Sequence, residues 1–178
     1  RTYEQNGEPI DDGPLYRIPR TLLFSSGFST VALGIAGASL KALIDLSSTR
    51  TQARVRGLIQ EQKTTQRLIG EAEAIHRSAR AFLQQSTSSV WESAYKGETL
   101  TTEQRINLRL ASTHGIRQAA RVVDTAYELV GSGSIFPTNP IHRRFQDIHV
   151  ITQHIQGRST HYETAGQFFL GLEPEGNF

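Results

Sequence analysis

Apolar residues recur every three or four positions through a long central segment, and this spacing constrains the fold more than any other feature. The residues that follow it are Ala72, Ile75, Ala79, Phe82 and Leu83. Residues at this spacing lie on one face of an α-helix, so they predict a helix whose apolar stripe faces a core. We expect the segment from about Leu58 to Lys96 to form one long helix that ends at Gly97.

Four further segments are predicted to be helical. They run from about Arg20 to Ser47, from Thr101 to Val130, from Ile141 to Gln156 and from Thr160 to Leu170. No segment shows the alternation of apolar and polar residues that is typical of a half-buried strand. Four long helices with short links predict an all-α fold, an antiparallel four-helix bundle.

Two of these helices begin with specific capping signals. Thr101, followed three residues later by Gln104, matches a capping box. Asn139 is a favoured N-cap residue. Pro140 suits the next position, because its missing N–H group would have no partner in the first turn.

Composition excludes several classes of function. The 178 residues contain no cysteine, so neither a disulfide framework nor a thiolate metal site can form. The 19 basic and 17 acidic residues leave a formal net charge of +2, and the bases are scattered. A nucleic-acid interface needs clustered bases with aromatic residues between them. No apolar run reaches the roughly 20 residues of a bilayer span, so we expect a soluble, cytoplasmic protein.

We expect three parts along the chain. Residues 1–18 contain Gly7, Pro9, Gly13 and Pro14 and are predicted to be a linker from a missing upstream domain. Residues 19–157 are predicted to form the bundle, and residues 158–178 a short helix and a tail. The chain starts at Arg1 and contains no methionine, which favours a part of a longer polypeptide.

Small residues recur at about one-turn spacing in the first predicted helix, at Gly27, Gly34, Gly37 and Ala38. Glycine costs ~1 kcal/mol relative to alanine inside a helix. Several together indicate that another backbone or a flat ligand comes close, and tight packing between helices is the alternative explanation.

The segment from Gly131 to Asp147 carries a resemblance to a known family. Gly131-Ser132-Gly133-Ser134 occupies the place of a glycine-rich loop, Pro140 lies nine residues after its first glycine, and Arg143 and Asp147 follow on the next helix. This pattern resembles the C-terminal helical domain of the acyl-CoA dehydrogenase fold. Two loop glycines are replaced by serine, and Gln146 replaces an arginine. Pairing of Arg143 with Asp147 as simple helix stabilisation is an alternative explanation for those two residues.

The chain departs from acyl-CoA dehydrogenases where their catalytic base is expected. Ile155-Gln156-Gly157 stands in place of a Glu-Gly-Thr segment, and no Asp or Glu occurs between Pro19 and Ala42. Proton abstraction beside a thioester needs such a carboxylate. The chain looks more like the two-component, flavin-dependent monooxygenases of the same fold. That resemblance implies reduced FAD or FMN from a separate reductase, O2 and a small aromatic, phenolic substrate.

The same resemblance supplies candidate site residues. It implies that His154, seven residues after Asp147, is catalytic, and imidazole suits this role because it exchanges protons near neutral pH. The alternative is a solvent-facing histidine. The residues implied in cofactor binding, from a neighbouring subunit of a homotetramer, are Arg54, Arg56, Gly131 and Ser134. The candidate substrate-binding residues are Trp91, Tyr95 and His149. For the aromatic pair, packing in the core or between subunits is the alternative, and for the Gly/Ser run, a flexible loop.

No metal site is predicted, because His142 and His149 share a helix face without a third ligand. Two other functions stay open: an acyl-CoA dehydrogenase-type oxidoreductase domain, and a non-catalytic helical oligomerisation module. By itself, this chain is not expected to catalyse a reaction.

Overall fold

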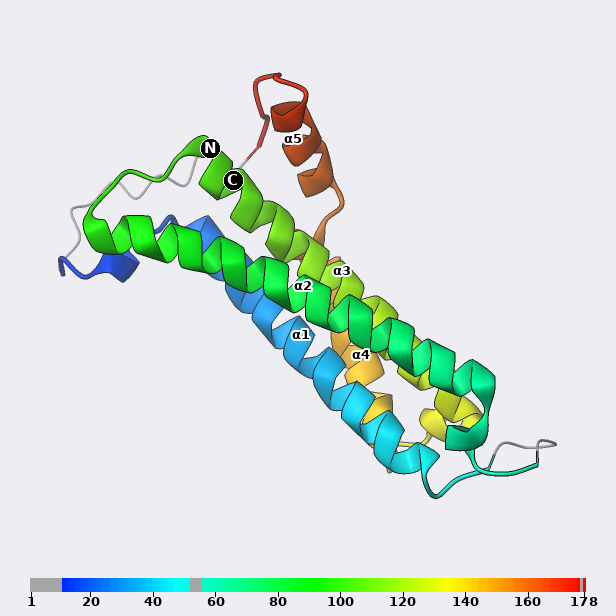
Figure 1. Cartoon of the computed structure of the whole chain (residues 1–178). Helices are drawn as coiled ribbons and strands as arrows, with labels where there is room; N and C mark the ends of the chain where they lie inside the picture. Colours follow the sequence, from blue (N-terminus) through cyan, green and yellow to red (C-terminus); the bar gives the residue numbers. More distant parts are fainter. Residues whose placement is uncertain (1–10, 52–55, 177) are drawn as a thin grey trace.

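Three long helices lie side by side along the length of the molecule, as Figure 1 shows for the computed structural model. They are α1 (Arg20–Ser47), α2 (Lys63–Lys96) and α3 (Thr102–Val130). A shorter helix, α4 (Pro140–Gln153), packs against α1 and α3, and α5 (Thr160–Phe169) lies beside α3 at one end. The structure describes residues 11–51, 56–176 and 178.

Short 3₁₀ turns connect several of the helices. They are η1 (Pro14–Arg17), η2 (Ile59–Glu61), η3 (Gly131–Ile135) and η4 (Ile155–Gly157). The described residues contain no strand, only an isolated bridge between Thr51 and Leu58. The predicted all-α fold is therefore confirmed.

The helix ends follow the capping signals in the sequence. The Thr101 Oγ1 atom accepts a hydrogen bond from the Gln104 backbone N–H at 3.1 Å, and the Gln104 side chain accepts one from the Thr101 N–H at 3.0 Å. Gly97 ends α2 with a φ of +74°, a conformation that glycine adopts without strain. The Asn139 side chain accepts from the Ile141 N–H at 3.0 Å at the start of α4.

Helix α3 lies at the centre of the molecule and contacts α1, α2, α4 and α5. Its buried side chains include Ile106, Ile116 and Val123. The helix lies close to α1 at Gly115, where an added Cβ would overlap the hydroxyl of Ser29. A larger residue would not fit at this contact without a shift of Ser29.

Helix α1 is long and apolar enough to cross a membrane by length and composition alone. The prediction that no segment reaches this limit was therefore too strict for α1. In the structure, α1 contributes Leu22, Leu33, Leu40 and Leu43 to the buried core and packs along α3. These contacts are those of a core helix in a bundle.

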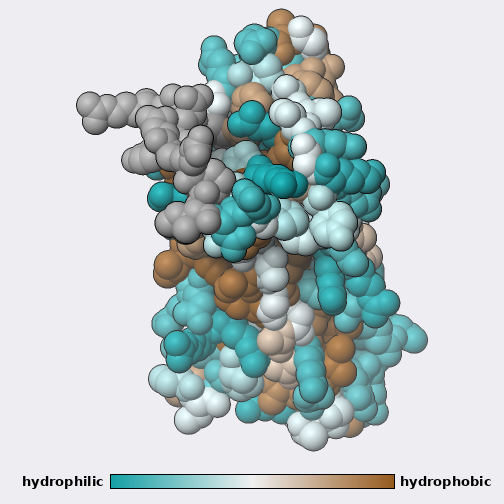
Figure 2. Space-filling view, turned by 90° about the vertical axis from the view of Figure 1, so that its left-hand side faces the viewer, coloured by the Kyte–Doolittle hydropathy of each residue, from teal (hydrophilic) through white to brown (hydrophobic). Residues whose placement is uncertain are grey.

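One face of α1 is not covered by the described residues. Phe24 and Val31 are 50% and 57% exposed. A Cβ added at Gly27 or Gly34 would meet no atom within 4 Å. Figure 2 views the molecule from the left-hand side of Figure 1 and shows hydrophobic surface exposed across its middle.

Candidate active site

A cavity of about 680 Å³ lies where the start of α1, the end of α4 and α5 meet α3. Its volume falls within the range of small-molecule sites, about 300–1,000 Å³. The residues that line it include Arg20, Phe24, Arg109, His154, Gln156, Arg158, His161 and Glu163. Five of the fifteen lining residues are arginine or histidine and two are glutamate, so the cavity favours an anionic or hydrogen-bonding ligand.

His154 lies in the wall of this cavity, directly after the end of α4. The helix ends at Gln153, three residues earlier than predicted, and His154 has an extended backbone with ψ of 150°. The chain turns here because Gln156 is buried against α3, and Gly157 fits between Ile116 and the carbonyls of Ile151 and Thr152. His154 is therefore held by a turn, not by a helix.

The His154 ring is fixed by two contacts. It stacks on Phe28 of α1, with 4.0 Å between ring centroids and 9° between planes. Its Nδ1 atom accepts a hydrogen bond from the Gln156 backbone N–H at 3.3 Å. Because Nδ1 accepts, the proton of the neutral ring is on Nε2, which makes His154 a hydrogen-bond donor.

A second, apolar hollow of about 490 Å³ adjoins the cavity. It is lined by Leu23, Phe24, Gly27, Phe28, Val31 and Ile151. Phe24 lines both spaces, and Phe28 carries the stacked His154 ring. The histidine therefore lies between the larger cavity and an apolar surface.

Arg109 of α3 is a buried cation in the cavity wall that the sequence analysis missed. Its side chain is 4% exposed. Its Nη1 donates to the Gln156 side-chain oxygen, and its Nη2 lies 2.7 Å from His161 Nε2. Burial lowers the pKa of Arg109 to about 10.

The sequence does carry a signal for Arg109. It lies three residues after Ile106 and seven before Ile116, so it interrupts the buried stripe of α3. Leu110, the next residue of α3, is only partly buried. A charged residue at the helical spacing of a core-facing stripe indicates a buried cation.

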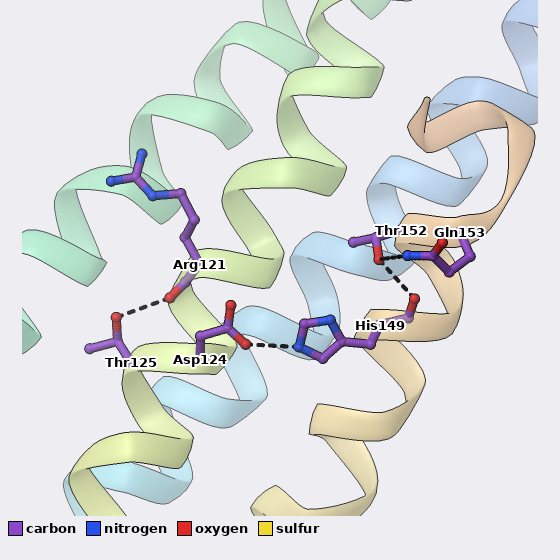
Figure 3. A network of polar contacts seen from close by, with 6 residues as sticks. All are labelled: Arg121, Asp124, Thr125, His149, Thr152 and Gln153. Carbon is purple, nitrogen blue, oxygen red and sulfur yellow. Dashed lines mark hydrogen bonds and ion pairs between the residues drawn. The ribbon is translucent and has the colours of Figure 1, made fainter. Parts of the chain in front are cut away.

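His149 points away from the cavity, toward α3. Its Nε2 atom lies 2.9 Å from Asp124 Oδ1, as Figure 3 shows, and its ring meets Phe145 edge to face. It is not among the residues that line the His154 cavity. The role of His149 in substrate binding stays a prediction.

Trp91 and Tyr95 lie on an outer face of α2, 44% and 70% exposed. Neither lines the cavity with His154, which is formed by other helices. Their role in substrate binding stays a prediction.

Two of the predicted cofactor-binding residues, Gly131 and Ser134, lie at the other end of α4 from His154. Gly131 ends α3 with a φ of +68°, and the buried Ser134 hydroxyl donates to the Gly131 carbonyl at 2.6 Å. Arg56 is exposed, and Arg54 lies outside the described residues. A Cβ added at Gly133 would lie 2.9 Å from Arg50, so this arginine lies beside the Gly131–Ser134 loop. Their role in binding a cofactor stays a prediction.

Two smaller features of the sequence also have a place in the structure. Of the small residues of α1, Gly37 meets the ring of His76 on α2, whereas Gly27 and Gly34 face open space. Arg143 pairs with Asp147 at 3.5 Å across an exposed face of α4. Within the described ranges, no three His, Asp or Glu side chains gather as a metal site requires.

The chain matches a known protein family over most of its length. The model of the acyl-CoA dehydrogenase C-terminal domain matches residues 26–158. An indole-3-acetate monooxygenase of Pseudomonas putida is 34% identical over 173 residues, which are 97% of this chain and 44% of that protein. An indole-3-acetate monooxygenase of Acinetobacter baumannii is 29% identical over 94% of this chain and 43% of its own length. The chain thus spans less than half the length of these relatives.

A solved structure has the same fold. XiaF from a Streptomyces species, in complex with FADH2 and glycerol, superposes with a TM-score of 0.87 at 18% identity. The superposition covers 93% of this chain and 42% of XiaF.

Proposed function

Because this chain belongs to the family of acyl-CoA dehydrogenase C-terminal domains, we propose that it is the helical C-terminal part of a flavin-dependent monooxygenase. The enzyme hydroxylates a small aromatic, phenolic substrate with O2 and reduced flavin, FAD or FMN, from a separate reductase. The observation that carries this proposal is the position of His154. Its ring is fixed between a cavity of substrate size and an apolar surface, with the Nε2 proton available.

The residues around His154 fit one face of a flavin. The hollow beside Phe28 is apolar, and a Cβ added at Gly27 would meet nothing within 4 Å, so a planar ring can approach the backbone of α1. Reduced flavin supplies the electrons with which O2 becomes able to insert one oxygen atom into the aromatic ring. Another domain or chain provides the other face of the ring.

In this arrangement His154 acts through the hydrogen-bond donor at Nε2. Nδ1 is occupied by the Gln156 N–H, and Nε2 carries the proton of the neutral ring. Donation from Nε2 polarises a substrate oxygen and orients the ring. The stacked Phe28 excludes water from one side of the imidazole, which strengthens this hydrogen bond.

The dehydrogenase alternative is disfavoured by Gln156. This neutral amide lies in the segment where the dehydrogenases have their Glu, and its side-chain oxygen is engaged by Arg109. The carboxylates that line the cavity, Glu163 and Glu175, are exposed to solvent. A solvated carboxylate is a weak base, so it is poorly suited to proton abstraction beside a thioester.

We further propose that the enzyme is a soluble, cytoplasmic homotetramer. Fourteen residues of α4 separate the Gly131–Ser134 loop from His154, a distance of roughly 20 Å along the helix. If Arg56 and this loop bind a flavin phosphate, that flavin belongs to the site of a neighbouring copy.

The test uses the full-length polypeptide that carries this chain, mixed with reduced flavin, O2 and a phenol. We expect hydroxylated product, with His154→Ala lowering turnover about 10²–10³-fold, as for the loss of one hydrogen-bond donor to the reacting oxygen, while the flavin Kd changes less than about threefold. His154→Gln retains an N–H donor near the Nε2 position and should keep more turnover than alanine.

Unchanged turnover in His154→Ala would show that His154 has no catalytic role. Reduction of bound flavin by an acyl-CoA, with no product from phenols, would establish the dehydrogenase alternative. If the polypeptide binds no flavin, the result would favour the alternative of a non-catalytic oligomerisation module.

A further inference from the structure

The guanidinium of Arg109 is a buried cation without a counter-charge. Its side chain is 4% exposed, and the described part of the chain forms no salt bridge to it. Nη1 donates to the neutral Gln156 amide, and Nε has no hydrogen-bond partner among the described residues. A buried charge is costly unless it is paired. The site is therefore incomplete as it stands.

The contact with His161 does not complete it. His161 Nε2 lies 2.7 Å from Arg109 Nη2 and 2.8 Å from the Ile155 carbonyl oxygen. This one nitrogen cannot accept from the guanidinium and also donate to the carbonyl. If His161 donates to the Ile155 carbonyl, which also accepts from the Arg158 N–H at 3.4 Å, the guanidinium keeps only the neutral Gln156 amide as its acceptor among the described residues.

The surroundings of Arg109 favour an anion. Arg20 and Arg158 line the same cavity, and the exposed Glu163 and Glu175 are its only carboxylates among the described residues. An arginine fork binds a carboxylate through two parallel hydrogen bonds. Phe24, in the same wall, offers an aromatic face to the rest of the ligand.

We propose that Arg109 binds a carboxylate of the substrate, so that the substrate is an aromatic acid with its ring toward Phe24 and its acid group against α3. This inference rests on the proposed function, because it names the substrate class of the His154 cavity. The indole-3-acetate monooxygenases that resemble the chain are named for such an acid. The geometry of Arg109 is independent of those names.

The experiment compares two ligands of nearly equal shape, indole-3-acetate and the neutral indole-3-acetamide. Both are titrated by calorimetry, without O2 or reductant, into the full-length polypeptide that carries this chain. Wild type should bind the acid about 10- to 100-fold more tightly than the amide. Arg109→Met should bring this ratio close to one and leave the amide affinity within about threefold, because methionine keeps an apolar side chain in the wall.

Two further variants keep the proposal testable if Arg109→Met does not fold. Gln156→Glu is nearly isosteric and places a carboxylate beside Arg109, so it should raise the thermal midpoint and abolish the preference for the acid. The matched control is Arg121→Met, an exposed arginine of the same helix, which should leave the ratio unchanged.

Equal binding of acid and amide by wild type overturns the proposal. So does an unchanged ratio in Arg109→Met or in a folded Gln156→Glu variant. If the acid preference depends on Arg109 but no phenol or indole is hydroxylated, the carboxylate site stands and the proposed reaction fails. If hydroxylation occurs with an unchanged ratio in Arg109→Met, the reaction stands and the carboxylate site fails.

Discussion

The contact between α1 and α3 at Gly115 allows a quantitative test of the packing. A Cβ added there would overlap the Ser29 hydroxyl and lie 3.5 Å from Leu33 Cδ1. Ser29 is fully buried, and its hydroxyl has no hydrogen-bond partner among the described residues. Gly115→Ala therefore has two opposing effects on the free energy of unfolding. Alanine has the better helix propensity, but its methyl group packs worse against Ser29.

The magnitudes follow from these contacts. Overpacking costs about 1–3 kcal/mol, and alanine is ~1 kcal/mol better than glycine inside a helix. Gly115→Ala should therefore lower the free energy of unfolding by about 0–2 kcal/mol. Ser29→Ala removes an unsatisfied hydroxyl and should raise it by about 1 kcal/mol or more. With both changes, the overlap disappears and Gly115→Ala becomes stabilising by ~1 kcal/mol.

The assay is urea unfolding of the two single variants, the double variant and wild type, followed by far-UV circular dichroism. We expect a coupling energy of about 1–3 kcal/mol between positions 29 and 115. Gly70→Ala is the matched control, because a Cβ there meets nothing within 4 Å. It should stabilise α2 by ~1 kcal/mol in either background. If Gly115→Ala has the same effect in wild type and in the Ser29→Ala variant, the hydroxyl is not the obstacle and the reasoning fails.

Three other substitutions test local features. Thr101→Ala removes the N-cap of α3 and should cost about 1 kcal/mol of unfolding free energy; no change in the urea midpoint would contradict the cap. Gly157→Ala brings a methyl group to 3.1 Å from Ile116 and 3.2 Å from two carbonyls, and should cost about 1–3 kcal/mol, measured in the same way. Burial lowers the pKa of His161, so the folded state binds its proton less readily than the unfolded state. Stability should therefore be complete above about pH 6.5, fall as pH drops from there toward the lowered pKa, and level off below that pKa. His161→Gln should reduce this fall, with His114, whose pKa burial also lowers, supplying the remainder; an identical pH profile would exclude His161.

The helices could be predicted from the sequence because their signals are local. The Thr101–Gln104 capping box, Gly97 and the Asn139 cap lie within a few residues of the ends they define, and each forms the expected contact. The spacing of Ala72 and Ala79 likewise places both residues in the core. These interactions depend on backbone geometry that neighbouring residues determine.

The end of α4 and the site could not be predicted in the same way. Gln156 lies in a buried turn, where Arg109, 47 residues away in the sequence, donates a hydrogen bond to its side chain. Helical periodicity continues through Gln156 and contains no information about a partner on α3. The stacking of His154 on Phe28 is similarly a contact between distant segments. Family resemblance identified His154, and only the structure shows the side chains around it.

The central position of α3 has a consequence for the order of folding. Five residues separate the end of α2 from the start of α3, whereas α1 reaches α3 only across the whole of α2. Short connections close at lower entropic cost, so we expect the α2–α3 hairpin to form first and α1 to dock after the rate-limiting step. Substitutions in the α1–α3 contact should then accelerate unfolding and leave the folding rate nearly unchanged. The approach of α1 to Gly115 would thus determine how long the folded domain persists.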